Sequence, residues 1–273
     1  MLMTPVPQQA PVERPRPIVS IEGVSKRFGN GTLALSGMSL KVRDGEFVSL
    51  LGPSGCGKST ALRLVAGLGQ PTTGRIDWPK AQYTAEGRPL REMGFVFQEP
   101  TLMPWATVFR NVWLPLRLKG VTREGAREQV MAALEMVRLQ KFPNAYPREL
   151  SGGMKMRVSI ARALVMRPRI LLMDEPFAAL DEITRQRLND DLLGLWEQFR
   201  WTILFVTHSV TEAVYLSNRI VVMAARPGRV IADTENELGY PRDVGVRTSA
   251  EFAVASRRVS GILNDSMGAD EHL

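Results

Sequence analysis

The chain has 273 residues, of which 44% are hydrophobic and 23% are charged. These proportions are ordinary for a folded globular protein, and they exclude wholesale disorder. The formal net charge of +7 is compatible with nucleic acid, anionic lipid headgroups or nucleotide phosphates as partners and does not choose among them; because no run of like charges stands out, a mildly basic solvated surface is the simplest interpretation.

The beginning of the sequence is rich in proline and has almost no apolar periodicity, which predicts a disordered tail over residues 1–17. This segment lacks the basic-then-apolar order of a secretory signal. A membrane-spanning helix needs about 20 nearly uninterrupted apolar residues. The most apolar stretch, 202–223, contains Glu212 and Arg219, so no span is predicted. The single cysteine, Cys56, excludes an internal disulfide and fits a reducing compartment such as the cytosol.

Strand and helix patterns begin near residue 18. Two runs, 18–24 and 33–42, carry short apolar or alternating patterns between glycines, which predicts a small antiparallel β layer. The apolar run 47–51 ends at a glycine-rich turn and is followed by helical character over 59–66. From 105 to about 165, apolar residues recur at helical spacing, which predicts an inserted helical region.

The second half of the chain has the rhythm of a parallel sheet with crossover helices. Short apolar runs at 170–173 and 203–206 are separated by the helical stretch 184–199, so the expected fold class is α/β. The remaining elements expected are a hairpin formed by 220–223 and 230–232, and a final amphipathic helix over 250–263.

A phosphate-binding loop is predicted where the run 47–51 ends. Glycines let backbone N–H groups converge on phosphate oxygens, the following helix offers unpaired N–H groups and a positive dipole end, and Lys58 adds a full charge. The Ser59 hydroxyl is suited to magnesium. A plain glycine turn is the structural alternative, which the flanking strand and helix disfavour. The motif consists of Gly52, Pro53, Ser54, Gly55, Cys56, Gly57, Lys58 and Ser59.

Two adjacent carboxylates follow the apolar run 170–173. A sheet delivers such acids to its ligand-binding carboxyl edge, although a solvated strand end is an alternative for this string alone. Together with the phosphate loop, the string predicts a magnesium-site acid at Asp174 and a water-orienting acid at Glu175. One nucleotide-binding domain is therefore expected over 18–245, with a helical subdomain over about 100–166 and a C-terminal helix and tail over 246–273.

Three further residues have open interpretations. Ser151, with the glycines after it, is either the N-cap of a helix or a grip on the γ-phosphate held by a second molecule. His208 follows the run 203–206, and a satisfied strand-end histidine is the alternative to a functional one. Cys56 lies near a helix N-terminus, which could lower the pKa of its thiol and make it reactive; a small residue that merely fits is the alternative.

Five strings, in order, resemble the nucleotide-binding subunit of ABC importers: GPSGCGKST, VFQEPTLMPW, LSGGM, LLMDEPFAALD and FVTHS. The resemblance runs from about residue 18 to 263. It implies the ABC ATPase fold, a phosphate-loop NTPase (RecA-like) core with an antiparallel β subdomain and an inserted α-helical subdomain. Within that family the chain looks most like the nitrate, sulfonate and taurine group, whose members often carry methionine at the position of Met154 and a similar PW segment.

The resemblance also implies a role for each matched residue. Phe28 would stack on adenine, with packing in the β layer as the alternative, and Gln98 would touch magnesium and the attacking water. The phosphate loop would extend to Thr60. His208 would contact the γ-phosphate. Residues expected to reach the second copy or its ATP are Ser151, Gly152, Gly153 and Asp181.

Leu102, Pro104 and Trp105 would line the surface that receives a permease's cytoplasmic helix, with ordinary core packing as the alternative. Met154 and Met156 depart from the glutamines common in the family, which puts the strength of dimer coupling in question. The implied cofactors are ATP and Mg²⁺. The implied partners are integral membrane permease subunits, a second copy of the chain and, indirectly, an external substrate-binding protein, at the cytoplasmic face of the membrane.

The competing function is a soluble ABC-type ATPase that acts on nucleic acid or the ribosome. Such relatives usually carry two cassettes or a long coiled-coil insertion, and this sequence has neither, so no nucleic-acid partner is expected. A phosphate-loop GTPase or a small-molecule kinase does not explain LSGGM, and the NKxD string that reads guanine does not occur.

Overall fold

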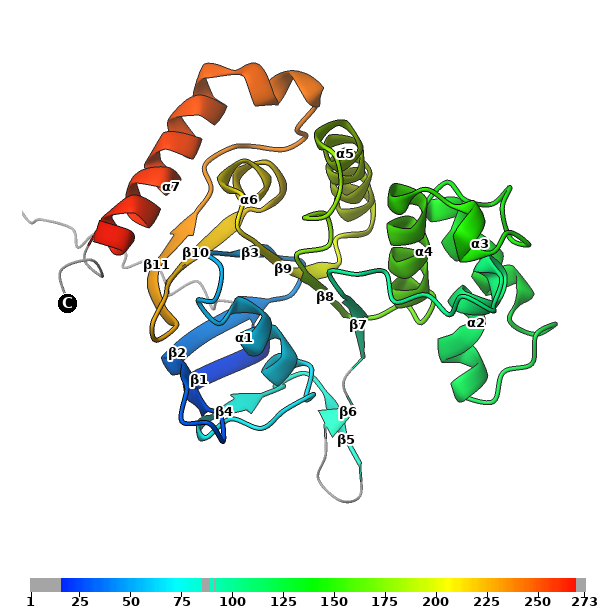
Figure 1. The fold of residues 1–273 in the computed structure, drawn as a ribbon, viewed down its shortest axis with the longest axis horizontal. Coiled ribbons are helices and arrows are strands. Elements are labelled where there is room, and N and C mark those ends of the chain that lie inside the picture. The colour runs from blue at the N-terminus through cyan, green and yellow to red at the C-terminus, as the bar shows by residue number, and fades with distance from the viewer. Residues whose placement is uncertain (1–15, 85–88, 91, 269–273) are drawn as a thin grey trace, which may run out of the picture.

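The structure is a computed structural model that describes residues 16–84, 89–90 and 92–268 (Figure 1). The predicted tail lies outside the described residues up to position 15, and Pro17 already begins the first strand. In the described part of the chain, no helix combines the length and the apolar character that crossing a bilayer requires.

The predicted antiparallel layer is confirmed. In it, β1 (Pro17–Arg27) lies between β2 (Leu33–Arg43) and β4 (Thr73–Asp77). Alternate residues of β2, among them Leu40 and Val42, are buried, as expected for a strand with one face on a core. Two short strands, β5 (Gln82–Tyr83) and β6 (Pro89–Leu90), form a separate pair.

The central sheet orders its strands β11, β10, β3, β9, β8, β7 among the described residues. All neighbours pair in parallel except β11, which pairs antiparallel with β10 as the expected hairpin. Every residue of β3, β8, β9 and β10 is buried, as is usual for parallel strands covered on both faces. The bounds are β3 Phe47–Leu51, β7 Met93–Val96, β8 Ile170–Asp174, β9 Thr202–Thr207, β10 Arg219–Ala224 and β11 Arg229–Glu235.

The two faces of the central sheet belong to different cores. Val48 and Leu50 of β3 pack with the antiparallel layer and α1 (Lys58–Val65), whereas Phe47 and Leu51 pack on the opposite side. Figure 1 shows the antiparallel layer and α1 below the sheet and the later helices above it. The helices of that upper side are α5 (Glu182–Phe199), α6 (Val210–Leu216) and α7 (Ala250–Gly268).

The helical region stands at the β7 edge of the sheet (Figure 1). It contains α2 (Val108–Leu118), α3 (Arg127–Met136) and α4 (Gly152–Leu164), with a short 3₁₀ turn at Pro147–Glu149. The fully buried amide of Asn111 organises its entry, because its Oδ1 accepts from Met103 N at 2.8 Å and its Nδ2 donates to Ala106 O at 3.0 Å.

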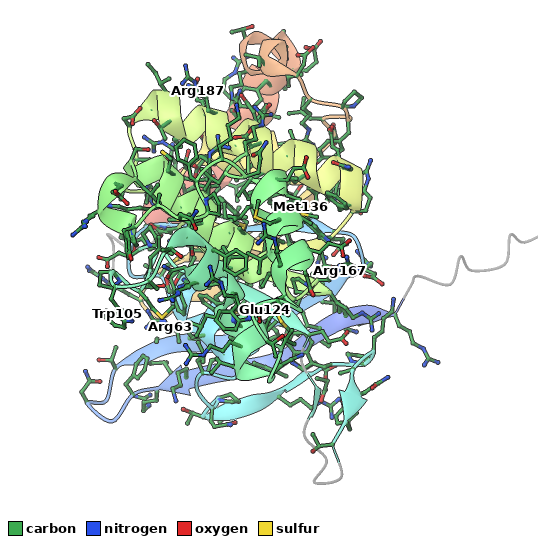
Figure 2. All side chains as sticks on the ribbon, turned by 90° about the vertical axis from the view of Figure 1, so that its right-hand side faces the viewer. Arg63, Trp105, Glu124, Met136, Arg167 and Arg187 are labelled. Atoms are coloured by element: carbon green, nitrogen blue, oxygen red, sulfur yellow. The ribbon has the colours of Figure 1, made fainter. Side chains whose placement is uncertain are left out.

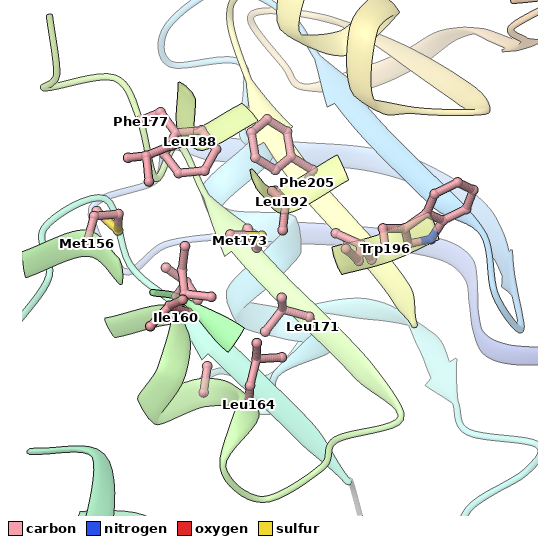
Figure 3. Packing of buried hydrophobic residues seen from close by; sticks show 14 of the residues in the cluster. Met156, Ile160, Leu164, Leu171, Met173, Phe177, Leu188, Leu192, Trp196 and Phe205 are labelled. Carbon is pink, nitrogen blue, oxygen red and sulfur yellow. The ribbon is translucent and has the colours of Figure 1, made fainter. Parts of the chain in front are cut away.

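Helix α4 joins this region to the main core (Figure 3). Its residues Met156, Ile160 and Leu164 belong to the same buried cluster as Leu171 of β8 and Leu192 of α5, among others. Burying each such side chain contributes about 1.5–3 kcal/mol. Met156 is only 2% exposed, so this departure from the family pattern fills the core and does not present a side chain to a partner.

The chain after β11 is tied down by a buried arginine. Arg242 is 5% exposed, and its Nη1 donates to Tyr215 O at 2.7 Å and to Val214 O at 2.9 Å. The final helix predicted over 250–263 is confirmed and continues to Gly268. Helix α7 packs against α6.

Candidate functional site

The predicted site residues gather where the parallel strands end. Strands β3, β8 and β9 are adjacent and parallel, so Leu51, Asp174 and Thr207 finish at one edge of the sheet. The predicted phosphate loop leaves β3 there and enters α1 at Lys58. This arrangement places the loop opposite the two predicted carboxylates, as the sequence indicated.

The loop folds around its own lysine. Gly55 and Gly57 have φ of 78° and 88°, the left-handed region that favours glycine. Lys58 is 4% exposed, and its Nζ donates to Gly52 O at 2.7 Å and to Pro53 O at 2.9 Å. A buried ammonium group at the start of a helix, beside backbone N–H groups, forms a strong anion-binding site.

Close packing holds this loop in place. A Cβ on Gly57 would lie 2.6 Å from Ala34 O, and a Cβ on Gly228 would lie 2.2 Å from Cys56 O. Gly228 belongs to the hairpin before β11, and its N–H donates to Ala34 O at 3.1 Å. The sequence predicted Gly228 only as a turn residue, and nothing in the local pattern indicates that it braces the phosphate loop.

The reactive interpretation of Cys56 is wrong. Its side chain is fully buried, and burial raises the pKa of the thiol despite the nearby charge of Lys58. Proximity to a helix N-terminus was the sequence argument for a lowered pKa, and the loss of solvent outweighs it. Cys56 stays a member of the phosphate loop as a small residue that fits.

Ser59 and Asp174 meet across the loop. The Ser59 hydroxyl donates to Asp174 Oδ1 at 2.6 Å. Asp174 is 5% exposed, and burial raises the pKa of its carboxyl, opposed in part by Ser59. A hydroxyl beside a buried carboxylate is a pair of hard oxygen ligands, so these two residues fit a magnesium ion.

Glu175 contacts two of the other predicted catalytic groups, His208 and Lys58. Its Oε2 lies 3.0 Å from His208 Nδ1, and its Oε1 lies 3.6 Å from Lys58 Nζ. The backbone of Glu175 has φ of 44°, a conformation that costs a non-glycine residue about 1 kcal/mol or more. Strain at a site residue indicates that the surrounding fold fixes its direction.

Gln98 and Phe28 are both exposed. Gln98 comes two residues after β7, whose Val96 pairs with Met173, so it lies at the edge of the sheet that carries Asp174. Phe28 is 45% exposed just after β1, with Lys26 Nζ 5.6 Å from its ring centroid. Exposure rules out the packing alternative for Phe28 and leaves its ring available to a planar ligand.

Ser151 and Asp181 are not joined to this cluster. Each is exposed and caps a helix: Ser151 Oγ accepts from Met154 N, and Asp181 Oδ1 accepts from Thr184 N. In the described residues, neither one shares a hydrogen bond or an ion pair with Lys58, Ser59 or the strand-end acids. The N-cap alternative for Ser151 is therefore what one copy of the chain shows.

The region around Trp105 faces outward. Trp105 is 75% exposed and Pro104 is also exposed, whereas Leu102 is half-buried against the core. Core packing is thus wrong as an explanation for Trp105 and holds in part for Leu102. Figure 2 places Trp105 at the edge of the molecule on which Arg63 of α1 also lies.

A phosphate loop on a parallel sheet, with a buried lysine, a serine–aspartate pair and a glutamate behind it, defines a phosphate-loop nucleoside triphosphatase. The ABC transporter family matches residues 35–178. The chain is 48% identical over 244 residues to a putative ATP-binding protein of Brucella abortus, covering 89% of this chain and 92% of the relative. It is 45% identical over 244 residues to the aliphatic sulfonates import ATP-binding protein SsuB of Bacillus cereus, covering 88% of this chain and 94% of the relative.

A dimeric, post-hydrolysis structure of the ATP-binding cassette MJ0796 bound to ADP and Pi superposes with a TM-score of 0.68 at 34% identity, covering 81% of this chain and all of the cassette. The chain belongs to the ABC transporter family and is an ATP-binding subunit of a transporter. It is an ATPase of the nitrate, sulfonate and taurine importer type, and the predicted family and fold are confirmed.

Proposed function

We propose that the chain energises uptake of a small anion, such as nitrate, a sulfonate or taurine, through a permease at the cytoplasmic face of the cell membrane. The observation that carries this proposal is the 45% identity, over 88% of the chain, to an aliphatic sulfonates import ATP-binding protein. An external substrate-binding protein would deliver the anion to the permease, which would select it. No feature of the described residues favours the competing action on nucleic acid.

In the proposed mechanism, the phosphate loop and Lys58 hold the β- and γ-phosphates of ATP. Lys58 Nζ would exchange its two carbonyl contacts for phosphate oxygens, and Ser59 and Asp174 would hold Mg²⁺. A bound Mg²⁺ would supply charge neutralisation for the transferred phosphoryl group. Gln98 and Thr60 complete this side of the site. Because phosphoryl transfer needs positioning and charge stabilisation more than covalent help, these contacts account for most of the acceleration.

Glu175 is the group that orients the attacking water in this proposal. Its carboxylate is directed by His208 on one side and Lys58 on the other, at 3.0 Å and 3.6 Å. The His208 ring is 47% exposed, which leaves it room to reach the γ-phosphate while still steering Glu175. Phe28 would stack on adenine.

Two copies of the chain would complete each site. Ser151 and Gly152 are exposed at the start of α4 and Gly153 follows them, buried; unpaired N–H groups and the helix dipole at this helix start favour an anion. They do not meet the phosphate loop of their own copy, which supports a head-to-tail pairing in which they reach the ATP of the second copy. Asp181, at the exposed start of α5, would contact the second copy at the same seam.

The permease would dock on a surface we call the Trp105 pocket, a cavity of about 430 Å³ lined by Trp105, Trp113, Arg110, Arg117 and Arg123 among others. Arg117 lies over the ring of Trp113 with its Cζ 5.7 Å from the centroid. No carboxylate in the described part of the chain lies within ion-pair distance of these three arginines. Apolar rings beside unpaired cations suit a permease helix that carries an acidic side chain.

The test is co-purification of the full chain with its permease. Trp105→Ala should abolish capture of the membrane protein and leave ATP binding intact, because the residue lies outside the nucleotide site. Tyr83→Ala is the matched control, since Tyr83 is an exposed aromatic (54%) on the separate β5–β6 pair. Capture of nucleic acid or ribosomes in place of a membrane protein would overturn the proposal.

The cargo is identified by a separate experiment. Deletion of the gene should abolish uptake of the transported anion, with nitrate, taurine and alkanesulfonates as the candidates to be measured.

A further inference from the structure

A buried carboxylate behind the nucleotide site has no part in the chemistry described so far. Glu212, in the first turn of α6, is only 8% exposed. Burying a carboxylate is costly unless hydrogen bonds compensate for the lost water. Its surroundings therefore indicate what it holds in place.

Glu212 is bonded to both sides of the turn that carries His208. The Thr207 hydroxyl donates to Glu212 Oε2 at 2.5 Å, and the same hydroxyl oxygen accepts from Ser209 N at 3.0 Å. The backbone N–H of Glu212 donates to Ser209 Oγ at 3.3 Å. Residues 207 and 209 are thus closed into one network, and His208 projects between them. We call this network, made of Thr207, Ser209 and Glu212, the histidine clamp.

The clamp holds the turn that directs His208 toward Glu175. The Nδ1 atom of His208 lies 3.0 Å from Glu175 Oε2. His208 makes no other hydrogen bond among the described residues, so its ring direction depends on the backbone of the turn and on Glu175. The order β9, turn, α6 is continuous in Figure 1, and α6 lies directly above the sheet.

The second oxygen of Glu212 faces helix α5. A polar cavity of about 220 Å³ there is lined by Arg185, Asn189 and Glu212, among others. Three buried atoms on its wall have no hydrogen-bond partner: Arg185 Nε, Asn189 Oδ1 and Glu212 Oε1. Burial raises the pKa of Glu212, and the Thr207 hydroxyl and the Asn189 side chain oppose this effect. Arg185 and His208 are the other titratable groups that act on the carboxyl.

We propose that Glu212 is a positioning residue for the hydrolytic step, which acts through Thr207 to hold the His208 turn in the direction that presents the ring to Glu175 and the γ-phosphate. This inference rests on the role proposed for His208. The clamp touches neither nucleotide nor water. Its effect is on geometry, and a misplacement of about 1 Å at a reacting group costs on the order of 10²-fold in rate.

The test removes one hydroxyl. Thr207→Val keeps the shape of the side chain and deletes the two hydrogen bonds of the Thr207 hydroxyl, whereas Thr207→Ser keeps the hydroxyl. The matched control is Thr202→Val at the other end of the same strand. Thr202 is also fully buried, and its hydroxyl likewise accepts one backbone N–H, from Gly45 at 3.0 Å, and reaches one carboxylate, that of Asp44 at 3.3 Å.

We expect Thr207→Val to lower kcat of the full chain about tenfold to a hundredfold with KM for ATP nearly unchanged, and Thr207→Ser to restore it. Thr202→Val should lose as much thermal stability and keep its kcat. Equal kcat losses in the two valine variants would show a structural role and overturn the proposal, as would normal turnover in Thr207→Val.

A second pair of variants asks which property of Glu212 matters. Glu212→Gln keeps an oxygen to accept from Thr207 and should retain kcat within about twofold, whereas Glu212→Leu should match Thr207→Val. An equal loss in both Glu212 variants would overturn the hydrogen-bond role.

The ring of His208 provides a readout that a general loss of stability does not move. The chain has two histidines, so the imidazole proton signals of His208 are identified in NMR spectra by comparison with His208→Gln. Thr207→Val should shift them and Thr202→Val should not; unshifted signals in Thr207→Val would overturn the clamp. Normal turnover in His208→Gln would instead refute the role proposed for His208, while the ring signals still decide whether the clamp exists.

Discussion

Gly228→Ala tests whether the turn of the β10–β11 hairpin supports the phosphate loop. An ideal Cβ at this position would lie 2.2 Å from Cys56 O and 2.7 Å from Ala34 O. Both obstacles are backbone atoms, which cannot rotate away as the end of a flexible side chain can. The hairpin or the loop must therefore move, and Lys58 depends on the loop for its position.

The size of the effect follows from the overlap. An ordinary contact at this Cβ begins near 3.4 Å, so the loop and the hairpin must separate by about 1 Å. Overpacking of this kind costs about 1–3 kcal/mol. For a chain of this size each kcal/mol lowers Tm by about 2–4 °C, so a fall of about 2–12 °C is expected. If half of that strain reaches the loop, the Kd for ATP rises about twofold to tenfold.

The measurements are a thermal unfolding curve and a titration with a fluorescent ATP analogue. Gly194→Ala is the matched control, because Gly194 is exposed within α5 and a Cβ there meets nothing within 4 Å. That substitution should stabilise the chain by about 0.5–1 kcal/mol and leave ATP affinity unchanged. A Gly228→Ala variant with the Tm and ATP affinity of the original chain would refute the idea that the hairpin supports the loop.

Three further outcomes follow from the site. Glu175→Gln should bind ATP and accumulate as an ATP-bound dimer in gel filtration while turnover falls about 10²–10³-fold; near-normal turnover contradicts its assignment. Iodoacetamide should modify Cys56 slowly in the native chain and rapidly in urea, because the thiol is buried with a raised pKa; fast inactivation with protection by ATP is the contrary result. Because the raised pKa of Glu212 makes the folded chain bind that proton more tightly than the unfolded chain, stability should fall as pH rises from the ordinary carboxyl pKa through the raised one. Urea unfolding across that range should give a flatter profile for Glu212→Gln, and an unchanged slope would refute this.

The order of strands and helices could be read from the sequence because the apolar patterns are strong and local. The run Ile170–Asp174 is buried on both faces and is preceded and followed by helices, which predicts a parallel strand. The proximity of Ser59 to Asp174 also followed, since parallel strands end at one edge of a sheet. These predictions needed only periodicity and topology.

What the sequence could not provide depends on packing between distant segments. The pKa of Cys56 depends on which groups cover the thiol, and the helix N-terminus beside it favoured the opposite direction. Gly228 acts on the phosphate loop from a hairpin far along the chain. The partnership of Thr207 with Glu212 is local, and a polar residue at the end of each element was its only signal. Its importance depends on burial, which no pattern reports.

The start of α4 packs directly against the start of α5 and the residues just before it. A Cβ on Gly153 would lie 2.7 Å from Thr184 Cγ2, and one on Gly152 would lie 3.4 Å from Leu180 Cδ2. The glycine backbone of α4 therefore lies directly against these two side chains. A displacement of the start of α4 would therefore be transmitted to Asp181, which caps α5. If Ser151 and Asp181 contact a second copy as proposed, a displacement of the outer helices would change both of these contacts at the same time.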